Sequence, residues 1–383
     1  MLTIHHLVSD REDGAGCFAS SLCTYLAGMG VSSSVTGPLP RFPISPYIKQ
    51  GFYYLVKKYP STISLVLVDW LFHKYSPPHT PSGAKIAILY GFNKFAIWLV
   101  LNRWRYQSVF IYSIDAEGYS SVCHHSYDCI NYETGCSSCP QVKAIWRPLV
   151  SLNSFLKSRM YRKYVTAILC ENAYSLRLVT SSNISGRVLS KVVGLATDVP
   201  TDSDSASRDF LRRMSTGGDN TIFVLCSASN ILNPRKRVLD IIEAFKCIRV
   251  ENAVLVVVGL NAQRFSSVHD NIVALDALSL RDYLLIASAC HIFVSASTHD
   301  LGPTTISQAF SMGLFLCSTP TGEALEHISP GLNGYFVHHD LHDLQHMLAK
   351  TINLCKFSPR PSRVDLMHQV ASRLLDMCAD SMA

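Results

Sequence analysis

The sequence lacks any apolar run long enough to cross a membrane. Its longest runs, Phe95–Leu101 and Ile63–Val68, fall far short of the roughly 20 residues that a spanning helix needs. The N-terminal MLTIHHLVSD has no cationic start followed by an apolar stretch, which argues against a signal peptide. Thirteen cysteines, an odd number scattered over 383 residues, do not resemble a secreted disulfide framework. We therefore expect a cytoplasmic protein.

Signatures of nucleic-acid binding are also missing. There is no zinc-finger spacing, aromatic RNA-binding motif or helix-turn-helix signal. Apolar residues make up 48% of the chain and charged residues 16%, so a large core is available and disorder is not expected. A length of 383 residues suggests two domains.

Apolar runs that read as strands alternate with helical patterns along the chain. The runs are continuous in Val, Ile and Leu, as in strands covered on both faces, and the alternation predicts parallel sheets with crossover helices. A polar segment at 201–220, rich in Ser, Asp and Gly, breaks the series and is the best domain boundary. The predicted strands are 2–8, 63–69, 85–91, 108–115, 165–170 and 187–194 before it, and 221–229, 253–259, 271–276, 291–297 and 314–319 after it.

Polar residues follow the predicted strand 291–297, in the stretch SASTHDLGPTTISQAFSMG (295–313). Ligands of open α/β sheets bind outside the carboxyl ends of the strands. A helix is predicted at 305–313, with Thr304 or Thr305 as its N-cap. Its first amides and positive dipole end would suit a phosphate.

Three consecutive cations, Arg235, Lys236 and Arg237, stand at the start of a helix predicted over 236–248. Cations oppose the dipole at a helix N-terminus, so an anion is expected beside them. A diphosphate would supply it, since Arg offers a fork of donors and Lys a point charge. The alternative is a surface basic cluster. The polar strand end in the same predicted domain favours the phosphate.

Five stretches carry a resemblance to a known family. HIFVSASTHDLGPTTISQAFSMG (291–313) resembles the donor-binding segment of retaining GT-B glycosyltransferases of family 4, in which two acidic residues lie eight positions apart. Asp300 and Gln308 occupy those two positions here. The other four stretches resemble the family's motifs in the correct order, and the likeness extends over nearly the whole chain. These stretches are 13–16, 192–199, 230–245 and 318–337.

The resemblance implies an α/β GT-B architecture of two Rossmann-like domains whose parallel sheets face across a cleft. The N-terminal domain, 1–200, would bind the acceptor, and 221–360 would bind a nucleotide-sugar after the linker 201–220. The C-terminal 361–383 includes an amphipathic helix, which the resemblance implies packs back towards the N-terminal domain. Closure of the two domains would exclude water and suppress hydrolysis.

The implied activity is sugar transfer from a nucleotide-sugar to a glycan or lipid-linked acceptor, with retention at the anomeric carbon and no catalytic metal. Asp115 would lie near the acceptor, and Asp300 would hold sugar hydroxyls. The residues expected to bind the donor are Asp13, Gly14, Ala15, Gly16, Arg235, Lys236, Leu301, Gly302, Pro303, Thr304, Thr305 and Gln308.

A cysteine-rich insertion at 115–142 resembles one in family members from bacterial exopolysaccharide and lipopolysaccharide assembly, which implies a role in cell-surface polysaccharide synthesis. Its spacing, C-x5-C-x6-C-x2-C, could close a tetrahedral zinc site, with His124 and His125 as spare ligands. The alternatives are reduced, partly buried thiols or a disulfide of oxidised preparations. The four cysteines are Cys123, Cys129, Cys136 and Cys139.

Departures from the family pattern motivate a second hypothesis. The family's His before Asp115 is Ile114 here, and its second acidic residue is the uncharged Gln308. Asp115 could also be a strand-end cap without chemistry. The alternative to an active enzyme is therefore a catalytically silent relative that binds nucleotide-sugar or a partner protein.

The chain's positive charge is concentrated in its first half. Residues 1–200 carry 19 Lys and Arg against 10 Asp and Glu, whereas 201–383 carry 15 against 18. The excess is densest over 143–163, where cations mix with aromatic and aliphatic residues. This segment is either a solvated helix face or a surface that rests on anionic lipid at the inner face of the plasma membrane.

Overall fold

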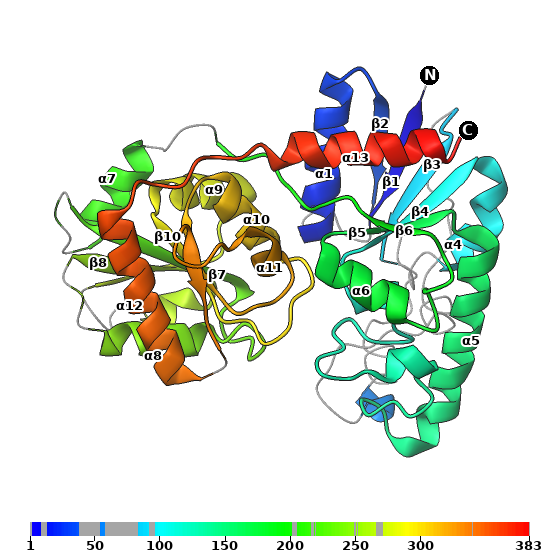
Figure 1. Ribbon diagram of the computed structural model, residues 1–383, viewed down its shortest axis with the longest axis horizontal. Helices are drawn as coiled ribbons and strands as arrows, with labels where there is room; N and C mark the ends of the chain where they lie inside the picture. The colour runs from blue at the N-terminus through cyan, green and yellow to red at the C-terminus, as the bar shows by residue number, and fades with distance from the viewer. Residues whose placement is uncertain are drawn as a thin grey trace. The chain divides into compact units, whose positions relative to one another are not determined.

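The computed structural model consists of two compact units, Met1–Thr197 with Met367–Ala383, and Asp198–Leu366 (Figure 1). The predicted strand 63–69 and Asp13 lie outside the described residues. No helix among the described residues is long and apolar enough to span a bilayer. The structure describes residues 2–8, 14–37, 54–57, 83–91, 96–200, 205–215, 218, 220–248, 250, 252–265, 271–338 and 340–382.

The N-terminal unit is built on a parallel sheet whose six described strands follow the order β2-β1-β3-β4-β5-β6. The sheet edge strand β2 was not predicted, because its sequence SSSVT lacks the apolar run of a buried strand. The strands are β1 Thr3–Leu7, β2 Ser32–Thr36, β3 Ile86–Tyr90, β4 Ser108–Ser113, β5 Ala167–Cys170 and β6 Ser190–Val192.

The C-terminal unit holds a second parallel sheet, with its six described strands in the order β12-β11-β10-β7-β8-β9. The expectation of two Rossmann-like α/β domains is thereby confirmed. The strands are β7 Ile222–Asn230, β8 Ala253–Leu260, β9 Ile272–Leu275, β10 Ile292–Ser295, β11 Phe315–Ser318 and β12 Gly334–Phe336.

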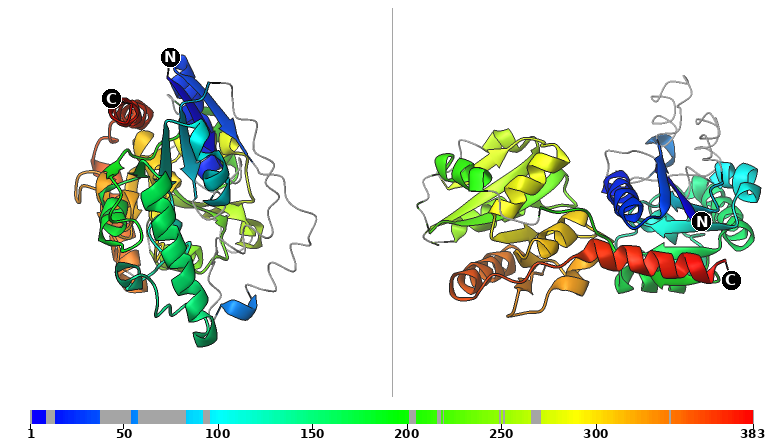
Figure 2. Two further views of the ribbon diagram at one scale, coloured as in Figure 1. Left: turned by 90° about the vertical axis from the view of Figure 1, so that its right-hand side faces the viewer. Right: turned by 90° about the horizontal axis from the view of Figure 1, so that it is seen from above.

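Helices connect the strands of both sheets (Figure 2). In the N-terminal unit the described ones are α1 Gly14–Gly28, α4 Ala96–Asn102, α5 Arg147–Tyr164, α6 Ala173–Ser181 and α13 Leu366–Asp380, with short 3-10 turns η1 Arg103–Arg105, η2 Ala116–Gly118, η3 Asn131–Thr134 and η4 Ala144–Trp146. In the C-terminal unit they are α7 Ser205–Arg213, α8 Val238–Cys247, α9 Leu280–Ala289, α10 Thr304–Ser311, α11 Glu323–His327 and α12 Leu341–Phe357, with η5 Ala262–Phe265.

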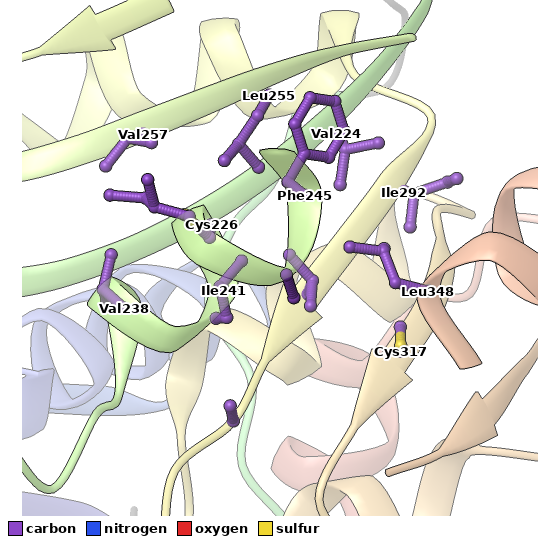
Figure 3. Close-up of a cluster of buried hydrophobic side chains, with 14 of the residues drawn as sticks. Val224, Cys226, Val238, Ile241, Phe245, Leu255, Val257, Ile292, Cys317 and Leu348 are labelled. Carbon is purple, nitrogen blue, oxygen red and sulfur yellow. The ribbon is translucent and has the colours of Figure 1, made fainter. Parts of the chain in front are cut away.

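Both faces of the C-terminal sheet are buried, which explains its continuous apolar strands. Along β7 the buried side chains alternate between two core clusters: Val224 faces one and Leu225 the other. Figure 3 shows the first cluster, where β7 and β8 pack against α8 and against Leu348 of α12. Helices α7, α9 and α10 contribute to the second cluster, on the opposite face.

The strand order reverses at a defined place in each sheet. In the C-terminal unit, β8 and β9 lie on one side of β7, and β10 to β12 lie on the other. In the N-terminal unit the reversal falls between β1 and β3. Open α/β sheets bind ligands outside the carboxyl ends of the strands at such switch points. The segments that follow β7 and β10 therefore meet where a ligand is expected.

Two segments near the unit boundary differ in role. The segment expected to be a linker, 201–220, contains helix α7, whose Leu211 is buried in the C-terminal core.

Helix α13, red in Figure 1, belongs to the N-terminal unit, where His368 Nδ1 lies 3.2 Å from the hydroxyl of Tyr25 on α1. Lys191 and Asp380 form an exposed ion pair at 3.1 Å near the end of the same helix.

Candidate functional site

The cations Arg235 and Lys236 are positioned by the turn between β7 and α8. Asn233 shapes this turn, since its side-chain oxygen accepts from the Arg235 amide at 3.0 Å and its carbonyl from the Lys236 amide at 3.0 Å. Arg237 then takes a left-handed backbone with φ of 49° and caps α8. Its guanidinium pairs with Asp240 at 2.6 Å on the helix. The third cation of the cluster is thus paired within α8.

Arg235 and Lys236 converge on one carboxylate from the segment after β10. Asp300 Oδ2 accepts from Arg235 Nη1 at 3.0 Å and from Lys236 Nζ at 2.5 Å. Arg235 Nη1 also donates to the His299 carbonyl at 2.7 Å, and the Thr298 amide donates to the Arg235 carbonyl at 2.9 Å. Side-chain and backbone bonds together fix the 298–300 segment against the turn after β7.

The charges of this cluster do not cancel. Two cations meet one carboxylate, and the three side chains are between 12% and 21% exposed. Such half-buried groups interact more strongly than fully solvated ones, because less water screens them. One positive charge remains for an anion at the switch point. Asp300, which was expected to hold sugar hydroxyls, contacts both cations.

Helix α10 begins a few residues beyond Asp300. Its N-cap is Pro303, and no side chain caps it, so the expected capping by Thr304 or Thr305 is wrong. Both threonines lie in the first helical turn instead. A proline ring cannot accept a hydrogen bond, so the first-turn amides have no side-chain acceptor from the N-cap. Such a helix start suits an anion.

A close backbone contact supports the loop before α10. Gly322 has φ of 47°, and a Cβ there would lie 2.2 Å from the Leu301 carbonyl oxygen and 2.7 Å from that of Asp300. Only glycine permits both this conformation and this approach. The segment 318–337, which resembles the family in sequence, therefore packs closely against the backbone of Asp300 and Leu301.

A buried carboxylate ties α10 to α11. Glu323 Oε2 accepts from Ser307 Oγ at 2.9 Å and lies 3.1 Å from His327 Nε2, whose ring stacks on Phe310 with centroids 4.3 Å apart. Gln308, the neighbour of Ser307, is only 4% exposed. Gln308 therefore lies on a helix that contacts α11 through both Ser307 and Phe310.

In the N-terminal unit, Asp115 lies two residues beyond β4. Its Oδ1 accepts from the Glu117 amide at 2.8 Å and thereby caps the 3-10 turn η2. Its Oδ2 lies 3.2 Å from His124 Nδ1, and His124 Nε2 lies 3.1 Å from Glu117 Oε1. A backbone bond of 3.0 Å from the Ala116 amide to the His124 carbonyl folds the insertion back onto the strand end. Asp115 therefore is a strand-end cap and also holds a histidine.

Lys157 lies beneath this cluster. It is fully buried on α5 and donates to the carbonyls of Glu117 at 2.5 Å and Ser120 at 2.9 Å. The hydroxyl of Tyr161 donates to the carbonyls of Glu117 and Gly118 at 3.3 and 3.1 Å. Lys157 is thus not part of the basic surface to which the sequence pattern assigned it.

Burial and charge shift the pKa values of this cluster in opposite ways. Burial lowers the pKa of Lys157 to about 8, against the opposing charges of Glu117 and Asp115. Burial alone raises the pKa of Asp115, but the hydrogen bond and charge of His124, the Glu117 amide and the charge of Lys157 bring it below its ordinary value. Asp115 is therefore held as a carboxylate at neutral pH.

The glycine-rich stretch expected to approach phosphates starts a helix. Gly14, Ala15 and Gly16 form the first turn of helix α1 and are therefore not a loop. They follow β1, at the switch point of the N-terminal sheet. Asp13 of the same stretch lies outside the described residues.

The four cysteines of the insertion lie near one another. A hydrogen bond between thiols lowers the pKa of Cys139 to about 7 and raises that of Cys123, while burial raises that of Cys136 to about 11. Within the described part of the chain, the group of three metal-ligand atoms all within 4.8 Å of one another is Asp115, Glu117 and His124. The four thiols do not form such a group, so they are not closed around a point as in a tetrahedral zinc site.

Helix α5 exposes cations and apolar side chains together. Ile145 of η4 is 80% exposed, and Leu152 and Phe155 on α5 are 46% and 55% exposed. Arg159 lies over the Phe155 ring, 5.6 Å from its centroid. No Asp or Glu occurs between Glu133 and Glu171 in the sequence. The outer face of this segment is therefore both apolar and positively charged.

A known family model matches part of the C-terminal unit. Residues 222–356 match the family model described as Glycosyl transferases group 1, and no curated protein matches the chain. The matched residues include Arg235, Lys236, Asp300 and Gln308.

Solved structures match almost the whole chain in fold. Sucrose-phosphate synthase from Thermosynechococcus elongatus has a TM-score of 0.61 and 11% identity, with 100% of this chain and 97% of that one covered. WaaG, a glycosyltransferase involved in lipopolysaccharide biosynthesis, has 0.56 and 12%, with 98% and 95% covered. A putative UDP-N-acetylglucosamine 2-epimerase from Listeria monocytogenes has 0.56 and 12%, with 100% and 96% covered. At these identities the likeness shows the fold alone: the chain has the GT-B fold, and its residues 222–356 match the group 1 glycosyl transferase model.

Proposed function

We propose that this protein transfers a sugar from a nucleotide-sugar to a glycan or lipid-linked acceptor, with retention of the anomeric configuration, in cell-surface polysaccharide synthesis. The observation that carries the proposal is the convergence of Arg235 and Lys236 on Asp300, beside the start of α10 and inside the matched residues 222–356. A group 1 match favours transfer over the epimerase chemistry that shares this fold.

The donor diphosphate binds where positive charge exceeds negative. Arg235 offers a guanidinium fork and Lys236 a compact charge, and the first amides of α10 add donors. Asp300 keeps the two cations together before the donor arrives. When the nucleoside diphosphate departs, its growing negative charge meets cations already in place, and such preorganisation lowers the barrier.

The sugar and the nucleoside take neighbouring positions. The backbone of Leu301, Gly302 and Pro303, together with Asp300, faces the sugar hydroxyls, and Gln308 on α10 faces the ribose. Gln308 has both a donor and an acceptor for hydroxyls, although it has no charge. The acceptor hydroxyl lies near Asp115 of the N-terminal unit, and retention proceeds without an enzyme nucleophile. The segment Gly14–Gly16 approaches the phosphates.

A lipid-linked acceptor is supported by the outer face of η4 and α5. Ile145, Leu152 and Phe155 supply apolar contacts, while Arg159 adds charge that attracts anionic lipid. We propose that this face rests on the inner leaflet of the plasma membrane. Co-sedimentation with anionic vesicles tests it: binding that weakens with salt supports the surface, and no binding removes it.

Zinc binding by the insertion is a separate proposal. Cys123 and Cys139 already share a hydrogen bond. Cys129 and Cys136 lie near enough to this pair that their charges raise the pKa of Cys123, and Cys139 in turn raises the pKa values of Cys129 and Cys136. The thiols must draw closer together to hold a tetrahedral ion. Metal analysis of the reduced, purified protein decides between zinc and plain thiols: less than about half an equivalent removes the zinc proposal.

The second candidate is a silent relative that binds nucleotide-sugar without turnover. Ile114 offers no polar group beside Asp115, and Gln308 is uncharged. In addition, the Asp300 carboxylate is engaged by two cations. Donor binding with no transfer to a broad set of acceptors favours this reading.

The test is acceptor-dependent release of nucleoside diphosphate from a panel of UDP-, GDP- and ADP-sugars. Lys236→Ala should lower kcat/KM by about tenfold or more, because a charge-assisted bond contributes about 1.5–3 kcal/mol. Lys246→Ala is the matched control, since Lys246 pairs with Glu243 at the far end of α8, the helix that follows Lys236. Equal activity of both variants and the wild type would refute the assigned role of Lys236. NMR of the product gives its anomeric configuration.

A further inference from the structure

The carboxyl end of β4 holds a charge cluster of which the proposed transfer uses only Asp115. Its four charged members come from the strand end, the turn η2, the insertion and α5: Asp115, Glu117, His124 and Lys157. The side chains of Asp115 and His124 are each 21% exposed, whereas that of Glu117 is 2% exposed. Solvent or a ligand therefore reaches the Asp115–His124 pair from outside.

Both ring nitrogens of His124 face carboxylate oxygens. The Nδ1 contact to Asp115 is 3.2 Å and the Nε2 contact to Glu117 is 3.1 Å. An ionised carboxylate only accepts, and a neutral imidazole carries a single N–H. The Nδ1 contact is a hydrogen bond, whereas the Nε2 contact is an ion-pair distance without hydrogen-bond geometry. Two carboxylates on opposite sides of the ring favour its charged form.

The charges around His124 also favour an imidazolium over a bound metal. The three ligand atoms of Asp115, Glu117 and His124 lie within 4.8 Å of one another, as a divalent cation would need. However, the buried Lys157 already places one positive charge against the two carboxylates. An imidazolium makes the four groups neutral together, whereas a divalent ion would leave an excess positive charge beside a buried ammonium.

We propose that His124 is a positioning residue that orients the Asp115 carboxylate towards the acceptor. The inference rests on the proposed transferase function. The backbone bond from the Ala116 amide to the His124 carbonyl holds the histidine beside the strand end, and Glu117 Oε1 lies 3.1 Å from its second ring nitrogen. Since the residue before Asp115 is Ile114, the insertion supplies the polar partner that the strand end itself lacks.

Other titratable groups surround the cluster and set its response to pH. Asp115 interacts with His124 and Lys157, and Lys157 interacts in turn with the thiols of Cys123 and Cys136. Tyr161 of α5 lies near both carboxylates, and burial raises its pKa well above the ordinary value. Tyr161 therefore stays neutral where Asp115 titrates, and the acid side of a pH profile reports on Asp115.

The first test compares His124→Gln with the neighbouring His125→Gln as control. Glutamine can still donate one hydrogen bond to Asp115 but carries no charge. We expect kcat to fall by at least about tenfold in His124→Gln, because small displacements of a reacting group cost up to about a hundredfold. The acid limb of its kcat/KM profile should also move to higher pH, since the Asp115 pKa rises without the imidazolium. His125→Gln should keep both quantities.

A second measurement does not depend on turnover. The lowered pKa of Asp115 stabilises the fold above the unfolded value of 3.8, and this contribution is lost as pH falls through the folded value. The stability advantage of wild type over His124→Gln should therefore shrink as the pH falls below about 4. Absence of any transfer by wild type would refute the proposed function and leave this test intact.

Two results would overturn the inference about His124. One is a stability difference between wild type and His124→Gln that does not change with pH, which would mean that no charge pairing exists. The other is a folded His124→Gln enzyme with wild-type kcat and an unmoved acid limb, which would assign His124 a structural role only.

Discussion

Lys236 Nζ lies 2.5 Å from Asp300 Oδ2, although the two residues are 64 positions apart in the chain. The contact joins the turn after β7 to the segment after β10, at the point where the strand order of the C-terminal sheet reverses. A cation pair and its single carboxylate thus stand where an α/β sheet binds its ligand. The proposed donor site depends on this relationship.

Asp300→Asn should separate binding from turnover. The amide removes the negative charge that competes with the diphosphate for Arg235 and Lys236, so nucleoside diphosphate should bind as tightly or more tightly. Transfer should fall by about tenfold or more, because the sugar loses a charge-assisted contact. Titration calorimetry and steady-state kinetics on one preparation measure both. A parallel loss of binding and turnover would contradict the competition between carboxylate and diphosphate.

Gly322→Ala should destabilise the loop before α10. Its Cβ would collide with the carbonyls of Leu301 and Asp300 and would hold a strained φ, which together cost about 2–4 kcal/mol. Gly331→Ala is the control, since Gly331 also has a positive φ of 81° but its nearest neighbour would be 4.0 Å away. Chemical denaturation should show the larger loss for Gly322→Ala. Equal losses would mean that the carbonyl contact is unimportant.

Lys157→Met should change how stability depends on alkaline pH. Folding lowers the pKa of Lys157 from 10.5 to about 8, so between these values the unfolded chain binds more protons than the folded one. Stability contributed by this group therefore rises with pH over that window. The free energy of unfolding of wild type minus that of Lys157→Met should increase from pH 8 to about 10.5. A constant difference would show that folding does not lower the pKa of Lys157.

Phe155→Ser and Arg159→Gln should each weaken binding to anionic vesicles by about fivefold, since each exposed contact contributes about 1 kcal/mol. Phe357→Ser is the control, because Phe357 is 86% exposed and belongs to the other unit, at the end of α12. Co-sedimentation at low and physiological salt gives the affinities. Loss of binding by Phe357→Ser alone would move the membrane surface to the C-terminal unit.

Much of the fold follows from the sequence because its central strands are buried on both faces. The alternation of Val224 and Leu225 between two core clusters requires a continuous apolar run, which is easily recognised. The edge strands β2 and β12 are short and partly exposed, so SSSVT and GYF give no such signal. Strand pairing order and the division into units depend on contacts between distant segments.

The candidate site was predictable only in part. The position of Arg235, Lys236 and Asp300 at strand ends could be read from the pattern, but their ion pairs join segments that sequence spacing does not relate. Helix α5 misleads in the opposite way. Its buried face carries the charged Lys157, whereas the apolar Leu152 and Phe155 are exposed, so a hydrophobic-inside rule misplaces these three residues.

The pairing of His124 with Asp115 and Glu117 also escaped prediction. His124 lies nine positions after Asp115, and the eight residues between them show no α-helical or strand period in the sequence. The signal present in the sequence is the combination of an acidic pair two residues apart with a histidine in the following insertion. Such a combination also fits a metal site or a solvated loop, and only the three-dimensional structure distinguishes these possibilities.

The most direct test of the donor site is calorimetric titration of the protein with a nucleoside diphosphate and with the matching nucleoside. The base is the one whose sugar nucleotide gives the highest turnover or binding in the donor panel. We predict that wild type binds the diphosphate at least about a hundredfold more tightly than the nucleoside, and that Arg235→Gln combined with Lys236→Gln removes most of this difference. An undiminished preference for the diphosphate in the double variant would contradict it.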